Sequence, residues 1–158
     1  MNVPGNLERL RFLVKIVQRE SLHLRATDER LFASPLTPER LQSMDSDPAQ
    51  AEQMDAFVAR FARLQDTLGD KLVPALLQAL QEPVGAVIDN LDRAERLGWV
   101  ISADAWIEAR RLRNQMIHEY VDDLHVLAGN LQAGHRYVPV LLETAQRLLD
   151  EAGRRGWA

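Results

Sequence analysis

Apolar residues recur at helical spacing along almost the whole chain, and this spacing constrains the fold more than any other feature. Near the N-terminus they stand three or four positions apart, at Leu7, Leu10, Leu13, Val14 and Val17. Such spacing puts apolar side chains on one face of an α-helix, which can pack against other helices. Segments that alternate with a period of two are absent and β-branched residues are sparse, so we expect no strands.

Two residue pairs, Thr37-Pro38 and Asp47-Pro48, mark helix starts. In each pair, a residue that caps helix N-termini well precedes a proline, which suits the first helical position. We expect a short helix or a loop between the pairs and an amphipathic helix after the second pair.

Proline and glycine divide the middle of the chain. Gly69 is expected to end the amphipathic helix, and Pro74 either kinks one long helix or starts a new one. A further helix is expected to open at Glu82-Pro83 and to close at Gly98.

The last third of the chain is predicted to form two helices. Ser102 caps the first, which runs to about Leu131. Gly134 separates it from the second, which lies near Pro139 to Ala152. Together the segments predict one all-α domain over residues 1–158, an up-and-down bundle of five or six helices with mostly antiparallel neighbours.

Composition excludes several classes of protein. The chain of 158 residues has no cysteine, which excludes a disulfide framework, a zinc–thiolate site and an iron–sulfur cluster. A net charge of −4 excludes a broadly basic nucleic-acid-binding surface, although not a local basic patch. The chain shows no signal peptide, membrane span, metal-binding motif or phosphate loop, so we expect a cytoplasmic protein without metal or cofactor.

One polar segment, Arg110 to Tyr120, lies in the first of the two late helices and carries reactive side chains. At about 100° per residue, Arg113 falls inside or beside the apolar stripe, where its charge needs a partner. Asn114 and His118 are four residues apart and share an exposed stripe. His118 can transfer a proton near neutral pH, and Arg113, supported by Arg110, can hold a phosphate and stabilise its developing charge.

A histidine and an arginine are a workable minimal set for metal-independent RNA cleavage, in which the 2′-hydroxyl attacks and a cyclic phosphate forms. Arg113 and His118, however, lie about 140° apart on one helix, so their side chains converge poorly within one chain. Two copies of the helix that meet at a two-fold axis would place both pairs around one cleft. The spacing thus favours a composite site in a symmetric homodimer.

The segment Arg113–Tyr120 reads R-N-x-x-x-H-x-Y and resembles the signature of the HEPN superfamily, specifically the HepT-like branch that is paired with MNT nucleotidyltransferases. The resemblance implies a HEPN-like bundle, a symmetric dimer with an RNA cleft between its subunits, and a role as the toxin of a toxin–antitoxin pair. It also implies Arg113 and His118 as the ribonuclease pair and Asn114 as a support. Tyr120 matches the tyrosine that the partner enzyme, the antitoxin, modifies with AMP to silence the toxin.

Plainer interpretations of the same residues stand beside this one. His118 is then a solvated surface histidine, and Tyr120 is a tyrosine at the edge of the core. Arg113 is a structural arginine that pairs with a carboxylate of a neighbouring helix. Three aspartates are candidates for that partner: Asp66, Asp70 and Asp89.

Two other functions stay open. The bundle is either a non-catalytic partner of a nucleotidyltransferase that holds a nucleotide on its polar helix face, or a scaffold dimer without ligand, in which Arg113 is fully paired internally. The acidic net charge slightly favours the first of these. Among the other histidines, His125, with Asp122, belongs to the cleft or to a solvated face, and His23 and His135 are expected at the surface without partners.

Overall fold

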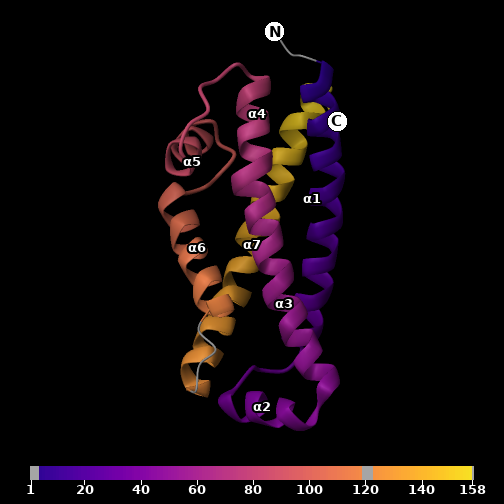
Figure 1. Ribbon diagram of the computed structural model, residues 1–158, viewed down its shortest axis with the longest axis vertical. Helices are drawn as coiled ribbons and strands as arrows, with labels where there is room; N and C mark the ends of the chain where they lie inside the picture. Colours follow the sequence, from indigo (N-terminus) through magenta and orange to yellow (C-terminus); the bar gives the residue numbers. More distant parts are fainter. Residues whose placement is uncertain (1–3, 119–122, 158) are drawn as a thin grey trace.

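The computed structural model describes residues 4–118 and 123–157, which form helices joined by short connections (Figure 1). The helices are α1 Pro4–Leu31, α2 Pro38–Ser43, α3 Pro48–Asp66, α4 Val73–Ala79, α5 Val87–Arg96, α6 Ala103–His118 and α7 Leu124–Arg154. Two turns of other types are the 3-10 turn η1, Met44–Ser46, and the π turn η2, Thr67–Leu72. The described ranges contain no strand, so the predicted all-α class is confirmed.

The long helices alternate in direction along the bundle. In Figure 1 the chain descends through α1, crosses the lower end at α2, ascends through α3 and α4, descends through α6 and ascends through α7. Because α3, η2 and α4 follow one another without a gap, they form one rod, and the described part of the chain has six separate rods. The predicted all-α bundle of five or six helices is therefore confirmed, and the up-and-down order holds for α1, the α3–α4 rod, α6 and α7.

Three predicted N-caps form as expected. Their side chains accept hydrogen bonds from N–H groups of the first turn: Thr37 from Arg40 at 3.1 Å, Asp47 from Gln50 at 3.3 Å and Ser102 from Ala105 at 3.1 Å. Each bond satisfies a donor that a helix start leaves free, and thereby fixes where the helix begins.

The helix predicted to open at Glu82-Pro83 starts only at Val87. The side-chain amide of Asn90 explains the delay, because it accepts from the Gly85 N–H at 2.9 Å and donates to the Gly85 carbonyl at 3.1 Å. These bonds hold the preceding segment as a loop against the helix start. Gly98, with a φ of +79°, follows the end of α5 as predicted, because glycine adopts this left-handed conformation without strain.

The prediction of one helix from Ser102 to about Leu131 is wrong. Helix α6 ends at His118, and α7 begins at Leu124 after an N-cap at Asp123. The Asp123 carboxylate accepts from two backbone N–H groups of the first turn, the nearer at 2.9 Å. An aspartate that caps so well makes a new helix start favourable at this point, and α6 and α7 then pack as an antiparallel pair (Figure 1).

Two glycines that were predicted to end helices instead lie buried inside them. A Cβ at Gly134, within α7, would lie 3.1 Å from Sδ of Met116 on α6. A Cβ at Gly69, within η2, would lie 2.9 Å from Nε1 of Trp106, also on α6. Both glycines therefore allow α6 to approach its neighbours closely, which sequence spacing does not distinguish from a helix end.

The hydrophobic core runs between α1, the α3–α4 rod and α7, with α6 closing one side. Its largest fully buried side chains include Trp106, Phe57 and Phe61. None of the helices in the described ranges combines the length and the hydropathy that crossing a membrane requires.

Replacing Gly69 with alanine should lower the free energy of unfolding by about 1–3 kcal/mol, because Trp106 is too buried to move away from the new methyl group. Gly129, exposed in α7, is the matched control, since a Cβ there meets nothing within 4 Å. Gly129→Ala should raise the free energy of unfolding by about 0.5–1 kcal/mol, because alanine favours helix. Urea denaturation measures both, and equal effects would contradict the close contact.

Candidate functional site

Arg113 lies on the side of α6 that faces α3. Its Nη2 atom donates to Oδ2 of Asp66 at 2.6 Å, which forms an ion pair between the two helices. The Arg113 side chain is only 27% exposed, so solvent screens the pair less than it screens pairs on the open surface. The interpretation of Arg113 as paired to a neighbouring carboxylate is confirmed, with Asp66 as the partner.

Asn114 holds the same guanidinium from the other side. Its Oδ1 atom accepts a hydrogen bond from Arg113 Nη1 at 2.8 Å. The first two residues of the R-N-x-x-x-H-x-Y segment therefore contact each other, and the orientation of Arg113 is fixed by two acceptors. Arg113 Nε is buried and has no hydrogen-bond partner in the described ranges, so the guanidinium retains one donor that these residues do not use.

Arg110 and Asp70 repeat this pairing one turn away. Arg110 Nη1 lies 3.6 Å from Asp70 Oδ1, and both side chains are more than a third exposed. The third arginine of the segment, Arg111, donates to Glu108 on its own helix at 2.9 Å. Each of the three guanidiniums thus contacts a carboxylate, so the local positive charge is smaller than the arginine count suggests.

The π turn η2 begins directly after Asp66 and contains Asp70, the two aspartates that hold these arginines. Its first residue, Thr67, donates through its hydroxyl to Glu20 Oε1 of α1 at 3.0 Å. Burial raises the pKa of Glu20, and the hydrogen bond from Thr67 and the charges of Arg63 and Lys71 offset part of the rise. Glu20 of α1 is therefore hydrogen-bonded to the first residue of the turn that follows Asp66 and contains Asp70.

His118 and Tyr120 complete the predicted segment. His118 is the last residue of α6, and its side chain lies outside the described part of the structure, as do Tyr120 and Asp122 entirely. Both positions lie on α6, and at about 100° per residue positions 113 and 118 are about 140° apart around its axis. The structure therefore brings together Arg113, Asn114 and Asp66, with the second pair of Arg110 and Asp70 beside them.

The expectation that His135 is a surface residue without a partner is wrong. Its Nδ1 atom lies 2.7 Å from Oδ1 of Asp28, and its ring stacks on Phe32 with 4.1 Å between centroids. The two elements, α1 and α7, are far apart in sequence, so spacing could not show the contact. His125 is exposed in the first turn of α7, as the solvated-face interpretation predicts.

In the described ranges, no three histidine or acidic side chains gather closely enough to hold a metal ion. Comparisons with protein-family models, with curated proteins and with solved structures each returned no match.

Asp66→Asn should lower the free energy of unfolding by about 1 kcal/mol, because the half-buried Arg113 loses its charged partner. The matched control is Asp70→Asn, which affects a longer and more exposed pair and should cost less than about 0.5 kcal/mol. Urea denaturation at low and high salt measures both. A larger loss for the Asp70 variant would contradict this ranking.

Glu20→Gln should raise the free energy of unfolding at pH 7. The pKa of Glu20 is higher in the folded chain than its ordinary value of 4.5, so the folded state holds a proton more tightly and loses stability as pH rises through that pKa. Glutamine removes this loss of stability. Below pH 4.5 both side chains are neutral, so the parent and the variant should have similar free energies of unfolding there. Thermal unfolding between pH 4 and 8 measures the difference. The same change at Glu29, an exposed residue of α1, is the matched control for the loss of one acidic side chain.

Proposed function

We propose that the chain is a metal-independent RNA endonuclease of the HEPN type, which acts as a symmetric homodimer and as the toxin of a toxin–antitoxin pair in the cytoplasm. The observation that carries the proposal is the fixed orientation of the Arg113 guanidinium. Asp66 and the motif asparagine, Asn114, hold the motif arginine in one orientation, and its buried Nε donor has no partner among the described residues. A guanidinium oriented in advance stabilises charge without reorganisation at the moment of reaction.

In the proposed reaction, His118 removes the proton from a ribose 2′-hydroxyl. The 2′-oxygen then forms a bond to phosphorus, and the bond from phosphorus to the 5′-oxygen of the next nucleotide breaks. The leaving 5′-oxygen takes a proton from the protonated imidazole (imidazolium) of His118 in the partner copy, which becomes neutral. Arg113 stabilises the negative charge on the phosphorane, and the products are a cyclic phosphate and a 5′-hydroxyl.

The dimer is part of the proposal because of the angle between positions 113 and 118. About 140° on one helix separates the acid/base residue from the phosphate-binding residue within a chain. Two α6 helices related by a two-fold axis would bring residue 118 of one copy toward residue 113 of the other, and each pair would occur twice.

Regulation by an MNT-type nucleotidyltransferase follows from the place of Tyr120. This residue lies two positions after His118, and AMP on its hydroxyl would add a phosphate charge beside the cleft. The added charge would repel the RNA backbone and block the site. The cognate enzyme would thus act as the antitoxin.

A non-catalytic role as a nucleotidyltransferase partner is the second candidate. One observation favours it: the three arginines near the motif are each already paired with a carboxylate, and the net charge of the chain is −4. Weak attraction for RNA follows from both facts. A partner that co-purifies, together with intact RNA, would identify this role.

Incubation of the purified protein with single-stranded RNA in the presence of a chelator tests the ribonuclease. His118→Ala should reduce the cleavage rate by at least about 100-fold, as loss of a general acid/base does. His125→Ala is the matched control, since that exposed histidine lies in the first turn of α7, and it should cleave at the parent rate. Equal cleavage by the parent and the His118 variant would overturn the proposal, as would intact RNA when mass spectrometry finds no AMP on the protein.

A further inference from the structure

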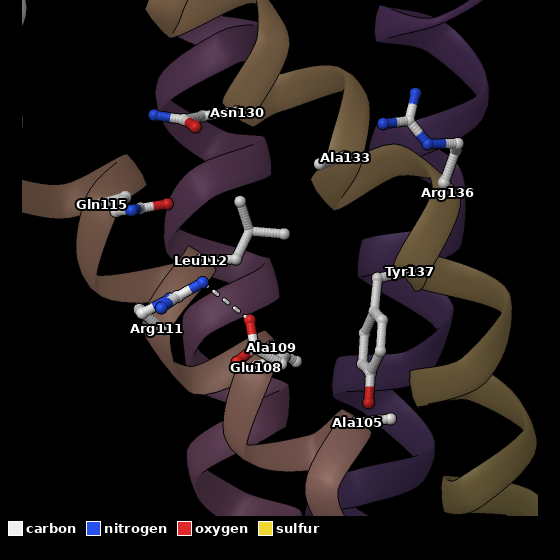
Figure 2. A pocket seen from close by; sticks show the side chains of 10 residues that line it. All are labelled: Ala105, Glu108, Ala109, Arg111, Leu112, Gln115, Asn130, Ala133, Arg136 and Tyr137. Atoms are coloured by element: carbon white, nitrogen blue, oxygen red, sulfur yellow. Dashed lines mark hydrogen bonds and ion pairs between the residues drawn. The ribbon is translucent and has the colours of Figure 1, made fainter.

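A groove of about 530 Å³ lies between α6 and α7, on a different side of α6 from Asp66. Figure 2 shows that both helices contribute to it, with apolar side chains between rims of polar ones. Ala109, Leu112 and Ala133 supply apolar surface. A groove of this size and mixed lining accommodates a small organic group rather than a single ion.

Two buried polar groups of this groove lack a hydrogen-bond partner in the described ranges. They are Nδ2 of Asn130 and the hydroxyl of Tyr137, both on α7. A buried donor without a partner is unfavourable, so a ligand that offers acceptors here gains binding energy. Burial raises the pKa of Tyr137 to about 12, which keeps its hydroxyl protonated and able to donate at physiological pH.

The charges around the groove favour an anion. Arg111 and Arg136 lie on its two sides (Figure 2), and Glu108, the one carboxylate among its lining residues in the described ranges, is paired with Arg111. Arg136 is exposed and has no ion pair or hydrogen bond within the described part of the chain. The guanidinium of Arg136 is therefore available to a phosphate.

The groove adjoins the position of the proposed acid/base residue. Gln115 lines it, and position 118 follows on the same helix roughly 4.5 Å further along the axis. A strand cleaved near position 118 would therefore pass the groove with its neighbouring nucleotide.

We propose that this groove binds one unpaired nucleotide of the RNA strand, next to the phosphate that is cleaved. The base packs on Leu112 and the alanines, and its carbonyl or ring-nitrogen acceptors take hydrogen bonds from Asn130 and Tyr137. Arg136 contacts the adjoining phosphate. The inference rests on the proposed function, because it assigns the groove to the substrate of that reaction.

Equilibrium binding of a fluorescent single-stranded RNA of twelve nucleotides to the His118→Ala chain tests the groove without cleavage. Ala133→Phe in that background fills the groove and should raise the Kd about ten-fold, as expected when one base loses its stacking surface. Arg136→Gln leaves the packing intact and should raise the Kd about three-fold and weaken its salt dependence. Arg30→Gln, at an exposed arginine of α1, is the matched control and should bind like the parent.

The possible outcomes distinguish failure of the groove inference from failure of the ribonuclease proposal. If the two groove variants bind RNA as the parent does, or if the parent does not bind this RNA, the groove inference is overturned. If both groove variants bind more weakly but the native chain leaves RNA intact, the groove inference is supported and the ribonuclease proposal fails. Circular dichroism tests whether each variant is folded. If the Ala133→Phe variant is unfolded, the binding of the Arg136→Gln variant decides the result, because Arg136 is exposed.

Discussion

The close packing of α6 between η2 and α7 is the constraint on which the rest of the structure depends. Glycine on each neighbour makes it possible, since a Cβ at Gly69 would lie 2.9 Å from Trp106 and one at Gly134 would lie 3.1 Å from Met116. Trp106 fills the space against the π turn and is almost fully buried. Helices this close have little freedom to shift, so side chains on both sides of α6 keep fixed neighbours.

The same packing decides what the polar side chains of α6 can do. On the side toward α3, Arg113 meets Asp66, which fixes the guanidinium and lowers the local charge. On the side toward α7, the alanines and Leu112 line a groove that also contains two buried donors, Asn130 Nδ2 and the Tyr137 hydroxyl, without a partner in the described part of the chain. One helix thus presents an oriented cation on one face and a groove on another. The proposed ribonuclease would rely on these few placed groups rather than on a basic surface, which the net charge of −4 does not provide.

Local features of the fold were predictable because they depend on neighbouring residues. Thr37, Asp47 and Ser102 cap helices as predicted, since a cap is a hydrogen bond over two or three positions. The positions of Gly69 and Gly134 inside helices were not predictable, because the missing side chain serves equally to end a helix and to admit another one. The start of α7 at Leu124 depends on the N-cap of Asp123, which competes locally with a continuous helical pattern of apolar residues. The contact of Arg113 with an aspartate was anticipated as one of three alternatives, but its choice among them was not.

The sequence by itself determined that this chain is helical, where several helices begin, and that an arginine and an asparagine stand side by side five and four positions before a histidine. These properties follow from spacing within a few turns, where each hydrogen bond joins residues three or four positions apart. Only the tertiary structure decided that Asp66 holds Arg113, that Asp28 holds His135, and that α6 and α7 enclose a groove. The first two contacts join residues 47 and 107 positions apart, and such pairs meet only when the packing of whole helices brings them together.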